Sequence, residues 1–418
     1  MKNVLSKAAL AALAATGGLA VSAGVAQAQS TPTIQPMSGA PEIRDGQQRF
    51  KVRGRFQFDV YSSDWDVLDE DAQRSYVRRA FIGAQGRLTD HWRYKIDFVL
   101  NPGANGATSN ANEDEVAVDD AYLEYAGDFY SIVIGENNVT SPLEDRTSSL
   151  DIPFIERSTY INAFGYGRAA GVAGLITGAN WMAAVGVYGD SLNNRENGFN
   201  NDETASISGR FTWAPIFESS PDSYRLIHLG VSARQRYMGD DSAFAYQARP
   251  LNGRGTRYID AGIAGESDTS LGAELALQWN AFGISAEYGQ LDGETAAGVG
   301  YDLTSYYVDA SWSLTGEPRS YRGNQGSFGP TVPLRSMADG GWGHWAVKAR
   351  YDYADLSDPA FANATRGEQS AVALGLDWVP VDHVRFMLNY AQTDLDRTGA
   401  GTTDEEATVI TLRSQFDF

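Results

Sequence analysis

The chain has 418 residues, a formal net charge of −20 at pH 7 and no cysteine. The acidic balance argues against nucleic-acid binding, which relies on basic surfaces. An exported protein without cysteine depends on backbone pairing and packing rather than on disulfides. Beyond the N-terminal apolar run, no stretch approaches the ~18 apolar residues of a membrane-spanning helix, so a chain of this kind crosses a membrane only as a closed β-barrel.

Residues 1–28 are expected to be a Sec signal peptide, because a short positive start precedes an Ala/Leu-rich run that ends in the A-x-A cleavage site Ala26–Ala28. Glycines dilute the apolar run, which argues against a membrane anchor. Residues 29–48 are polar with three prolines and are expected to form a flexible N-terminal segment. The β-barrel is expected over residues 49–418.

The first regular segment, "FKVRGRFQFDVY" (residues 50–61), alternates strictly between two faces. One face is apolar apart from a glycine, and the other opens with Lys51, Arg53 and Arg55. Period-2 alternation is the pattern of a strand with one face in each of two environments. A strand whose apolar face meets lipid must turn its cations inward, because Arg or Lys at the bilayer midplane costs ~2–4 kcal/mol.

The same alternation recurs in about sixteen segments, most of them near the ~10 residues of a tilted membrane strand. Short and long connections alternate between the segments, as short periplasmic turns and long external loops do in outer-membrane barrels. The exception is residues 316–341, a long connection where a short turn is expected. The expected strands are 50–61, 74–88, 91–101, 117–126, 129–137, 168–178, 180–189, 203–215, 222–238, 267–279, 281–291, 301–315, 342–355, 368–379, 382–394 and 406–418.

The final segment places the terminal Phe418 on its apolar face, which suits a strand that closes the barrel against the first one. Aromatic residues end many segments, as in the interfacial girdles of membrane barrels. A soluble β-sandwich or a propeller is the alternative, but the aromatic placement and the lack of a propeller-like repeat disfavour it.

Alternation assigns about fourteen basic and about ten acidic residues to the lumen, the reverse of the whole-chain bias. A lumen lined by Arg and Lys favours anions. The alternative is that these cations are salt-bridged wall residues without a role in selectivity. The basic set is Lys51, Arg53, Arg55, Arg79, Arg87, Arg93, Lys95, Arg210, Arg234, Arg236, Lys348, Arg350, Arg385 and Arg413. The acidic set is Asp59, Asp97, Asp120, Glu124, Glu274, Glu287, Asp309, Asp352, Asp377 and Asp417.

From about Phe50 to Phe418 the chain resembles the phosphate-selective porin O and P family of bacterial outer membranes. The strings that carry the resemblance are "FKVRGRFQFD", "YVRRAFIGAQGRLTDHWRYKIDF", "DDAYLEY", "SIVIGENN", "TSSLDIPFIERS", "TGEPRSY…FG", "GHWAVKARYDYADL" and "VRFMLNYAQTDLD". The resemblance implies a sixteen-stranded barrel, a homotrimer, and a third loop, here about 138–167, that folds inward and narrows the pore. It also accounts for the long connection at 316–341.

Carried over by position, the resemblance implies that anions pass a constriction lined by Arg53 or Arg55, together with Arg78, Arg79 and Lys95. Asp97 is then a nearby acidic partner, and Arg168 ends the third loop. The family's fifth loop often carries a ladder of alternating arginines. Here the matching "FAYQARP" keeps only Arg249, so a general anion pore stands beside a phosphate-specific one.

Motifs for chemistry are absent. The four histidines have no metal-ligand spacing, and no G-x-S-x-G, HExxH or P-loop string occurs. We therefore expect no enzyme activity, cofactor or metal, and as partners only small anions, outer-membrane lipid and further copies of the chain. The functional alternatives are a general porin for small polar solutes, motivated by the acidic loops, and a non-conducting structural barrel or adhesin.

Overall fold

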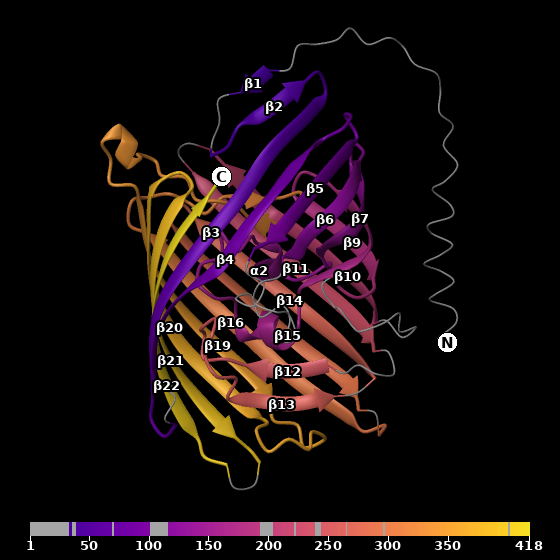
Figure 1. Ribbon diagram of the computed structural model, residues 1–418, viewed down its shortest axis with the longest axis vertical. Helices are drawn as coiled ribbons and strands as arrows, with labels where there is room; N and C mark the ends of the chain where they lie inside the picture. The colour runs from indigo at the N-terminus through magenta and orange to yellow at the C-terminus, as the bar shows by residue number, and fades with distance from the viewer. Residues whose placement is uncertain are drawn as a thin grey trace.

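The computed structural model describes residues 33–35, 39–68, 71–100, 116–192, 204–220, 223–238, 244–264, 266–295, 297–399 and 402–418. The expected signal peptide lies outside these ranges. Sixteen antiparallel strands close into a barrel, since β22 pairs with β3 and the main sheet of 18 strands also includes the outlying β1 and β2. Figure 1 shows the tilted strands around a common axis.

The barrel strands follow the sequence in order, which confirms the predicted all-β barrel. They are β3 (Gln48–Trp65), β4 (Ala72–Arg87), β5 (Trp92–Val99), β6 (Ala117–Ala126), β7 (Tyr130–Asn138), β8 (Arg168–Thr177), β9 (Trp181–Tyr188), β10 (Ala205–Ser219), β11 (Tyr224–Tyr237), β14 (Ser267–Trp279), β15 (Phe282–Glu294), β16 (Gly300–Ser313), β19 (His344–Leu356), β20 (Gly367–Val381), β21 (Val384–Arg397) and β22 (Glu405–Asp417).

The alternation in the sequence becomes two surfaces of the wall. On β20, Val372 and Leu374 are 54% and 55% exposed on the outside, whereas Ala371 and Ala373 between and beside them are buried. Charged residues of the other face are buried in the lumen, with Arg350 and Arg413 among the largest fully buried side chains. The outside is therefore apolar along the whole wall, and the polar face is enclosed.

The N-terminal segment differs in part from the flexible lead that its polar composition predicts. β2 (Glu42–Asp45) pairs with β3 from Gln48 to Lys51, and β1 (Thr33–Gln35) pairs with β2. These strands extend the barrel wall beyond its rim, next to the C-terminus (Figure 1). Backbone pairing orders this stretch, which has no side-chain pattern of its own that would indicate a strand.

Two connections from opposite ends fold into the lumen. Loop 3 (residues 139–167) enters from the long-loop end and carries the short helices α2 (Leu143–Arg146) and α3 (Thr159–Ala163). The 314–343 connection enters from the short-turn end and carries β17 (Tyr321–Arg322), β18 (Ser327–Phe328) and the 3₁₀ turn η2 (Met337–Asp339). Leu143 and Phe328 share one apolar cluster, so the two connections meet inside the barrel.

A third insertion fills much of the lumen at the long-loop end. The hairpin β12 (Phe244–Ala248) and β13 (Ile259–Ala264) lies across this end (Figure 1). It packs with α3 in an apolar cluster that includes Tyr160, Tyr246 and Phe361. The alternation in the strands does not reveal these lumen-filling residues, because they come from loops. No helix among the described residues is long and apolar enough to span a membrane.

Candidate pore constriction

Wall cations hold loop 3 by its backbone. Guanidinium and ammonium groups from β19, β21 and β22 donate to five backbone carbonyls between Leu150 and Glu156 and fix the course of the loop across the lumen. These bonds are Arg385 to Leu150 O (2.7 Å) and Ile152 O (3.0 Å), Lys348 to Pro153 O (2.6 Å), Arg413 to Ile155 O (2.6 Å) and Arg350 to Glu156 O (3.2 Å). Four of the cations assigned to the lumen are thus engaged in positioning the loop.

Glu156 of loop 3 ties the loop to strand β4. Arg78 of β4 donates to both oxygens of this carboxylate, at 2.7 and 2.8 Å, and Arg413 donates to one of them at 3.2 Å. Burial alone would raise the pKa of Glu156, but the two guanidinium groups hold that pKa well below its usual range. The carboxylate therefore stays charged and serves as a fixed anchor between the loop and β4.

A β-bulge in β4 turns two consecutive arginines inward. The pairing of β3 with β4 shifts register so that Gln57 faces Arg79 and Phe58 faces Val77, which leaves Arg78 as the extra residue. A bulge inserts one residue and resets the alternation beyond it. Arg78 and Arg79 are consequently both buried on the lumen side, at 7% and 8% exposure. Strict alternation assigned only Arg79 to the lumen, and the family resemblance supplied Arg78.

Arg55 and Arg79 make contacts with neutral groups. Arg55 donates to Ser149 Oγ at 2.7 Å and lies 4.9 Å from the ring centre of Phe81. Arg79 donates to Gln57 Oε1 at 2.8 Å. Within the described part of the chain, neither guanidinium forms an ion pair with a carboxylate. Two arginines that form hydrogen bonds to neutral groups rather than ion pairs therefore lie beside loop 3.

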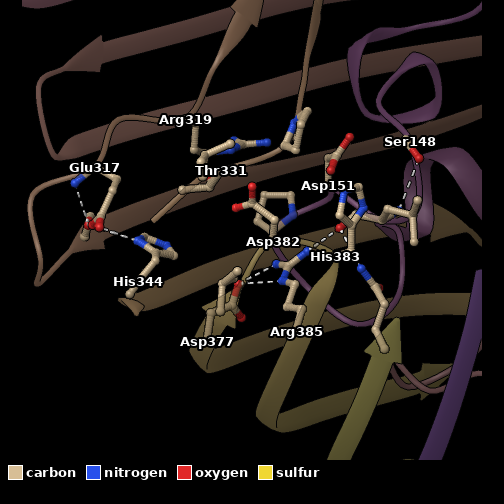
Figure 2. Close-up of a pocket in the computed structure, with 18 of the residues that line it drawn as sticks. Ser148, Asp151, Glu317, Arg319, Thr331, His344, Asp377, Asp382, His383 and Arg385 are labelled. Atoms are coloured by element: carbon tan, nitrogen blue, oxygen red, sulfur yellow. Dashed lines mark hydrogen bonds and ion pairs between the residues drawn. The ribbon is translucent and has the colours of Figure 1, made fainter. Parts of the chain in front are cut away.

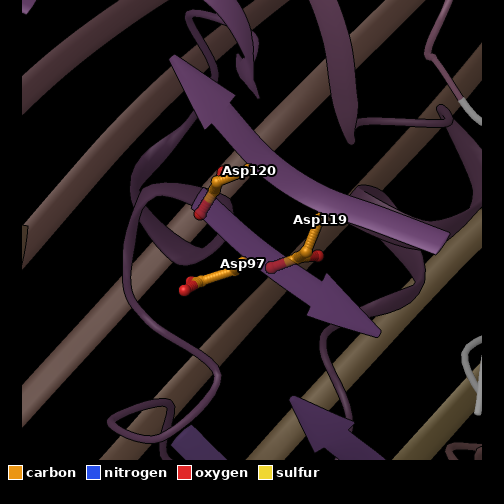
Figure 3. Close-up of side chains that lie close together, drawn as sticks. All are labelled: Asp97, Asp119 and Asp120. Carbon is orange, nitrogen blue, oxygen red and sulfur yellow. The ribbon is translucent and has the colours of Figure 1, made fainter. Parts of the chain in front are cut away.

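A second bulge, in β6, has the same effect on acidic residues. Asp97 faces Asp120 and Phe98 faces Val118, so Asp119 is the extra residue. Asp97, Asp119 and Asp120 are all buried and offer oxygens within 4.8 Å of one another (Figure 3). Strict alternation placed Asp97 and Asp120 in the lumen but missed Asp119, because a bulge leaves no mark in the period of the sequence.

Three cations neutralise this acidic trio. Arg53 Nε lies 3.4 Å from Asp97, and Lys95 Nζ lies 3.2 Å from Asp97 and also pairs with Asp120. Arg168 contacts Asp119 and Asp120, each at 3.0 Å. Because the trio already faces three positive side chains, its donor set does not favour a metal ion. Arg53, Lys95 and Arg168 thus lie together as members of a charge-balanced cluster.

Arg249 lies on the other side of loop 3, in the loop that contains β12 and β13. Burial and the neighbouring Arg257 and Arg78 lower the pKa of its guanidinium to about 10. Arg254 stacks on Tyr76, 5.4 Å from the ring centre. The single arginine of the incomplete ladder is therefore accompanied by two further cations from the same loop, so the positive charge here is greater than the ladder positions alone suggest.

A cavity of about 480 Å³ lies between loop 3 and the short-turn end. Arg53, Lys348 and Arg385 reach it from the wall, and Arg319 and Arg322 reach it from the 314–343 connection (Figure 2). Arg319 and Arg322 were missed from the sequence. The available signal was the anomalous length of this connection, with two arginines among aromatic and glycine residues.

The cavity also holds titratable carboxylates. Asp151 of loop 3 lines it, and burial raises the pKa of this residue to about 6 despite the nearby Arg385 and Arg322. Glu317 accepts hydrogen bonds from Ser313 and Thr315 and contacts His344 at 3.0 Å. These bonds lower the pKa of Glu317 to about 2 against the opposing effect of burial. The cavity is therefore lined by both positive and negative side chains, and its arginines lie around loop 3.

The family model for phosphate-selective porin O and P matches residues 50–418. The chain belongs to this family. Porin O of Pseudomonas aeruginosa is 26% identical over 458 residues, covering 99% of this chain and all of that protein. An uncharacterised protein of Caulobacter vibrioides is 28% identical over 414 residues, covering 94% of this chain and 79% of its own length. The predicted family membership is confirmed.

Solved porin structures share the fold of this porin O and P family member. An anion-selective porin from Comamonas acidovorans superposes with a TM-score of 0.53 at 13% identity, covering 89% of this chain and all of that one. The trimer form of OmpT from Vibrio cholerae gives a TM-score of 0.53 at 12% identity, covering 89% of this chain and 99% of that one. The protein is an outer-membrane porin with a closed barrel of sixteen strands.

Proposed function

We propose that this porin conducts small anions passively, with phosphate or polyphosphate as its substrate class. The observation that carries the proposal is the pair Arg55 and Arg79, which border loop 3 without a carboxylate partner among the described residues. A fixed positive charge in a narrow passage lowers the energy of an anion that has lost part of its hydration, and raises that of a cation.

A series of cations extends this site in both directions. Arg249 lies on the long-loop side, and Arg319 and Arg322 line the cavity on the short-turn side. Several weak sites in series let an anion leave as readily as it enters. Guanidinium groups also match phosphate oxygens with two parallel hydrogen bonds, which favours phosphate over halide. The family's name supports phosphate, and the anion selectivity stated for the Comamonas porin supports anion conduction in general.

A general porin with weak selectivity is the second candidate. The observation in its favour is the acidic trio, because it cancels the charge of Arg53, Lys95 and Arg168 at the same depth of the wall. The anion preference would be lower if permeating ions pass closer to this balanced cluster than to Arg55 and Arg79. The two candidates differ in the side of the constriction that the ions follow.

We also propose that the porin is a homotrimer, delivered by its signal peptide. β5 to β9 have only 8 to 10 residues each, whereas β14 to β16 have 13 or 14. At a tilt of ~40°, 8 residues rise about 20 Å, less than the ~25 Å apolar band of such barrels. A neighbouring copy would cover this low wall. The trimer form of Vibrio OmpT supports the proposal.

The test is a reversal-potential measurement on the purified porin in a planar lipid bilayer under a KCl gradient. We expect a potential set mainly by Cl⁻, and a chloride current that falls when millimolar phosphate is added. A potential set by K⁺ would refute anion conduction. A chloride current that phosphate leaves unchanged would refute the phosphate preference while leaving anion conduction intact.

A further inference from the structure

We propose that residues 332–342, called here the rim segment, insert into the phospholipid leaflet that faces the periplasm. The segment "VPLRSMADGGW" exposes three large apolar side chains that do not line the cavity, Leu334 (73%), Met337 (50%) and Trp342 (82%), whereas Val332 at its start does line it. Trp342 is among the most exposed large apolar residues of the described chain. Apolar side chains gathered in this way mark a surface that is covered in the working protein.

The rim segment is continuous with the lipid-facing surface of the barrel. The backbone oxygen of Trp342 accepts hydrogen bonds from the indole nitrogens of Trp345 (3.1 Å) and Trp378 (3.0 Å). The rings of Trp345 and Trp378 stack at 5.4 Å, and Trp378 stacks in turn on Phe386 at 5.4 Å. Outward-facing aromatic rings near the end of barrel strands belong to the interfacial girdle. The rim segment thus joins that girdle directly.

The position of the segment identifies the leaflet. In Figure 1 it projects sideways from the barrel at the end with the short turns and the C-terminus. Short turns face the periplasm in outer-membrane barrels. A lateral projection at this rim meets the membrane interface rather than the aqueous space below the pore.

The backbone of the segment is suited to an apolar environment. Gly341 N donates to Ser336 O at 2.8 Å, and Gly343 N donates to Arg335 O at 3.2 Å. Its charged side chains are bonded within the segment, since Arg335 donates to the backbone oxygen of Asp339 at 3.3 Å and Ser336 donates to the Asp339 carboxylate at 2.8 Å. Backbone hydrogen bonds within the segment lower the free-energy cost of moving its N–H and C=O groups out of water. Arg335, which is exposed, can in addition meet a lipid phosphate at the interface.

The rim segment lies on the side of the barrel opposite the low wall of β5 to β9. Lipid, rather than a second copy of the chain, therefore covers it. Following the strand order around the ring, β7 lies at the centre of the low wall of β5 to β9, and β19 lies eight strands away from it. The rim segment precedes β19 directly. This part of the argument rests on the proposed trimer, in which neighbouring copies cover the low wall. The rim segment then faces the lipid side of the assembly.

The absence of cysteine allows a single-site probe. Met337→Cys in the full porin is labelled with the fluorophore NBD and reconstituted in phosphatidylcholine vesicles. Val372→Cys, on the exposed outer face of β20, serves as the bilayer reference. Asp90→Cys, exposed in the turn between β4 and β5, serves as the aqueous reference. Each variant is first shown to keep the heat-modifiable gel mobility of a folded barrel.

We expect the label at 337 to be quenched by lipids that carry a nitroxide near the headgroup, and to be shielded from iodide at least fivefold relative to the label at 90. The label at 372 should respond more strongly to nitroxides deep in the acyl chains. Iodide quenching at 337 equal to that at 90 would overturn the proposal. Protection at 337 from both the lipid nitroxides and iodide would also overturn it, and would assign the segment to an interface between copies. Either result leaves the proposed anion conduction untouched.

Discussion

Two adjoining stretches of the barrel wall use the same cationic side chains for different tasks. On β19 to β22, cations such as Arg350 and Arg413 are buried, paired with carboxylates and bonded to loop 3. On β3 and β4, Arg78 also pairs with a carboxylate of loop 3, but Arg55 and Arg79 have neutral partners. The first stretch only holds the obstruction in the lumen, whereas the second also carries cations without an ion-paired carboxylate beside it. The role of an arginine in this barrel therefore follows from its partners rather than from its face.

The largest expected effect is on the wall that holds the loop. Arg350→Met leaves Asp309 and Glu144 buried without their cation, and breaking a buried pair costs about 3–5 kcal/mol. We expect a free energy of unfolding in urea that is lower by this amount, and a higher single-channel conductance because loop 3 loses an anchor. Arg225→Met, at an exposed pair with Glu218, is the control and should change neither quantity. Unchanged conductance in Arg350→Met would show that the loop does not limit flow.

The charge-bearing wall should determine selectivity. A unit charge about 7 Å from the path changes the energy of a monovalent ion by about 0.6 kcal/mol in a water-like dielectric, with opposite sign for Cl⁻ and K⁺, so each arginine contributes roughly eightfold to the Cl⁻/K⁺ permeability ratio. The double variant Arg55→Gln/Arg79→Gln should therefore lower this ratio by roughly fiftyfold. The reversal potential in a KCl gradient measures this ratio. Arg225→Gln, which removes an exposed cation from the outer face of β11, should leave the ratio unchanged. Equal effects of both variants would show that Arg55 and Arg79 do not act on ions in the lumen.

A smaller change in the opposite direction is expected at the acidic trio. Asp119→Asn removes one partner of Arg168 and unbalances the cluster toward positive charge. The Cl⁻/K⁺ permeability ratio should rise by about threefold or less. If the ratio does not respond while the Arg55→Gln/Arg79→Gln variant does, ions pass on the side of Arg55 and Arg79 alone. A response at Asp119 as large as that of the double variant would instead favour the general-porin candidate.

The smallest effect concerns pH. Asp151 is charged at pH 7.5 and becomes neutral as the pH falls through its raised pKa of about 6, so the cavity loses one negative charge among Arg319, Arg322 and Arg385. Anion preference should rise modestly between pH 7.5 and pH 5. Asp151→Asn isolates the carboxylate, since the part of the pH dependence centred near pH 6 should disappear in it. Superimposable curves would exclude Asp151 as the responsible group.

Much of the fold could be predicted because lipid and water impose a period of two on every strand. The predicted segment 406–418, for example, corresponds closely to β22 from Glu405 to Asp417. The pairing that orders β2 could not be predicted, since the ordering comes from the edge of β3 and not from its own composition. Loop packing was equally inaccessible, because Tyr160 and Tyr246 meet only once the barrel has closed around them.

The candidate site was predictable in its residue types but not in its charge balance. A bulge at Arg78 or Asp119 adds one residue without altering composition, so alternation assigns one of the two adjacent charges to the wrong face. The ion pairs could not be predicted for a different reason, because their members lie far apart in the sequence. Arg413 and Asp59, for example, are separated by 354 residues. The resemblance to a family supplied Arg78 and alternation supplied Lys95 and Arg79, but only the geometry distinguishes Lys95, which forms ion pairs, from Arg79, which bonds a neutral side chain.

The pairing of β22 with β3 places a constraint on biogenesis. Gln57 and Gln415, bonded across this seam, are separated by 358 residues, and the terminal Phe418 exchanges backbone hydrogen bonds with Gly54. The seam forms only after β22 has been exported, so a chain that lacks β22 cannot seal the wall. Until then the chain carries two unpaired strand edges, which must be shielded by other proteins between the two membranes to prevent aggregation.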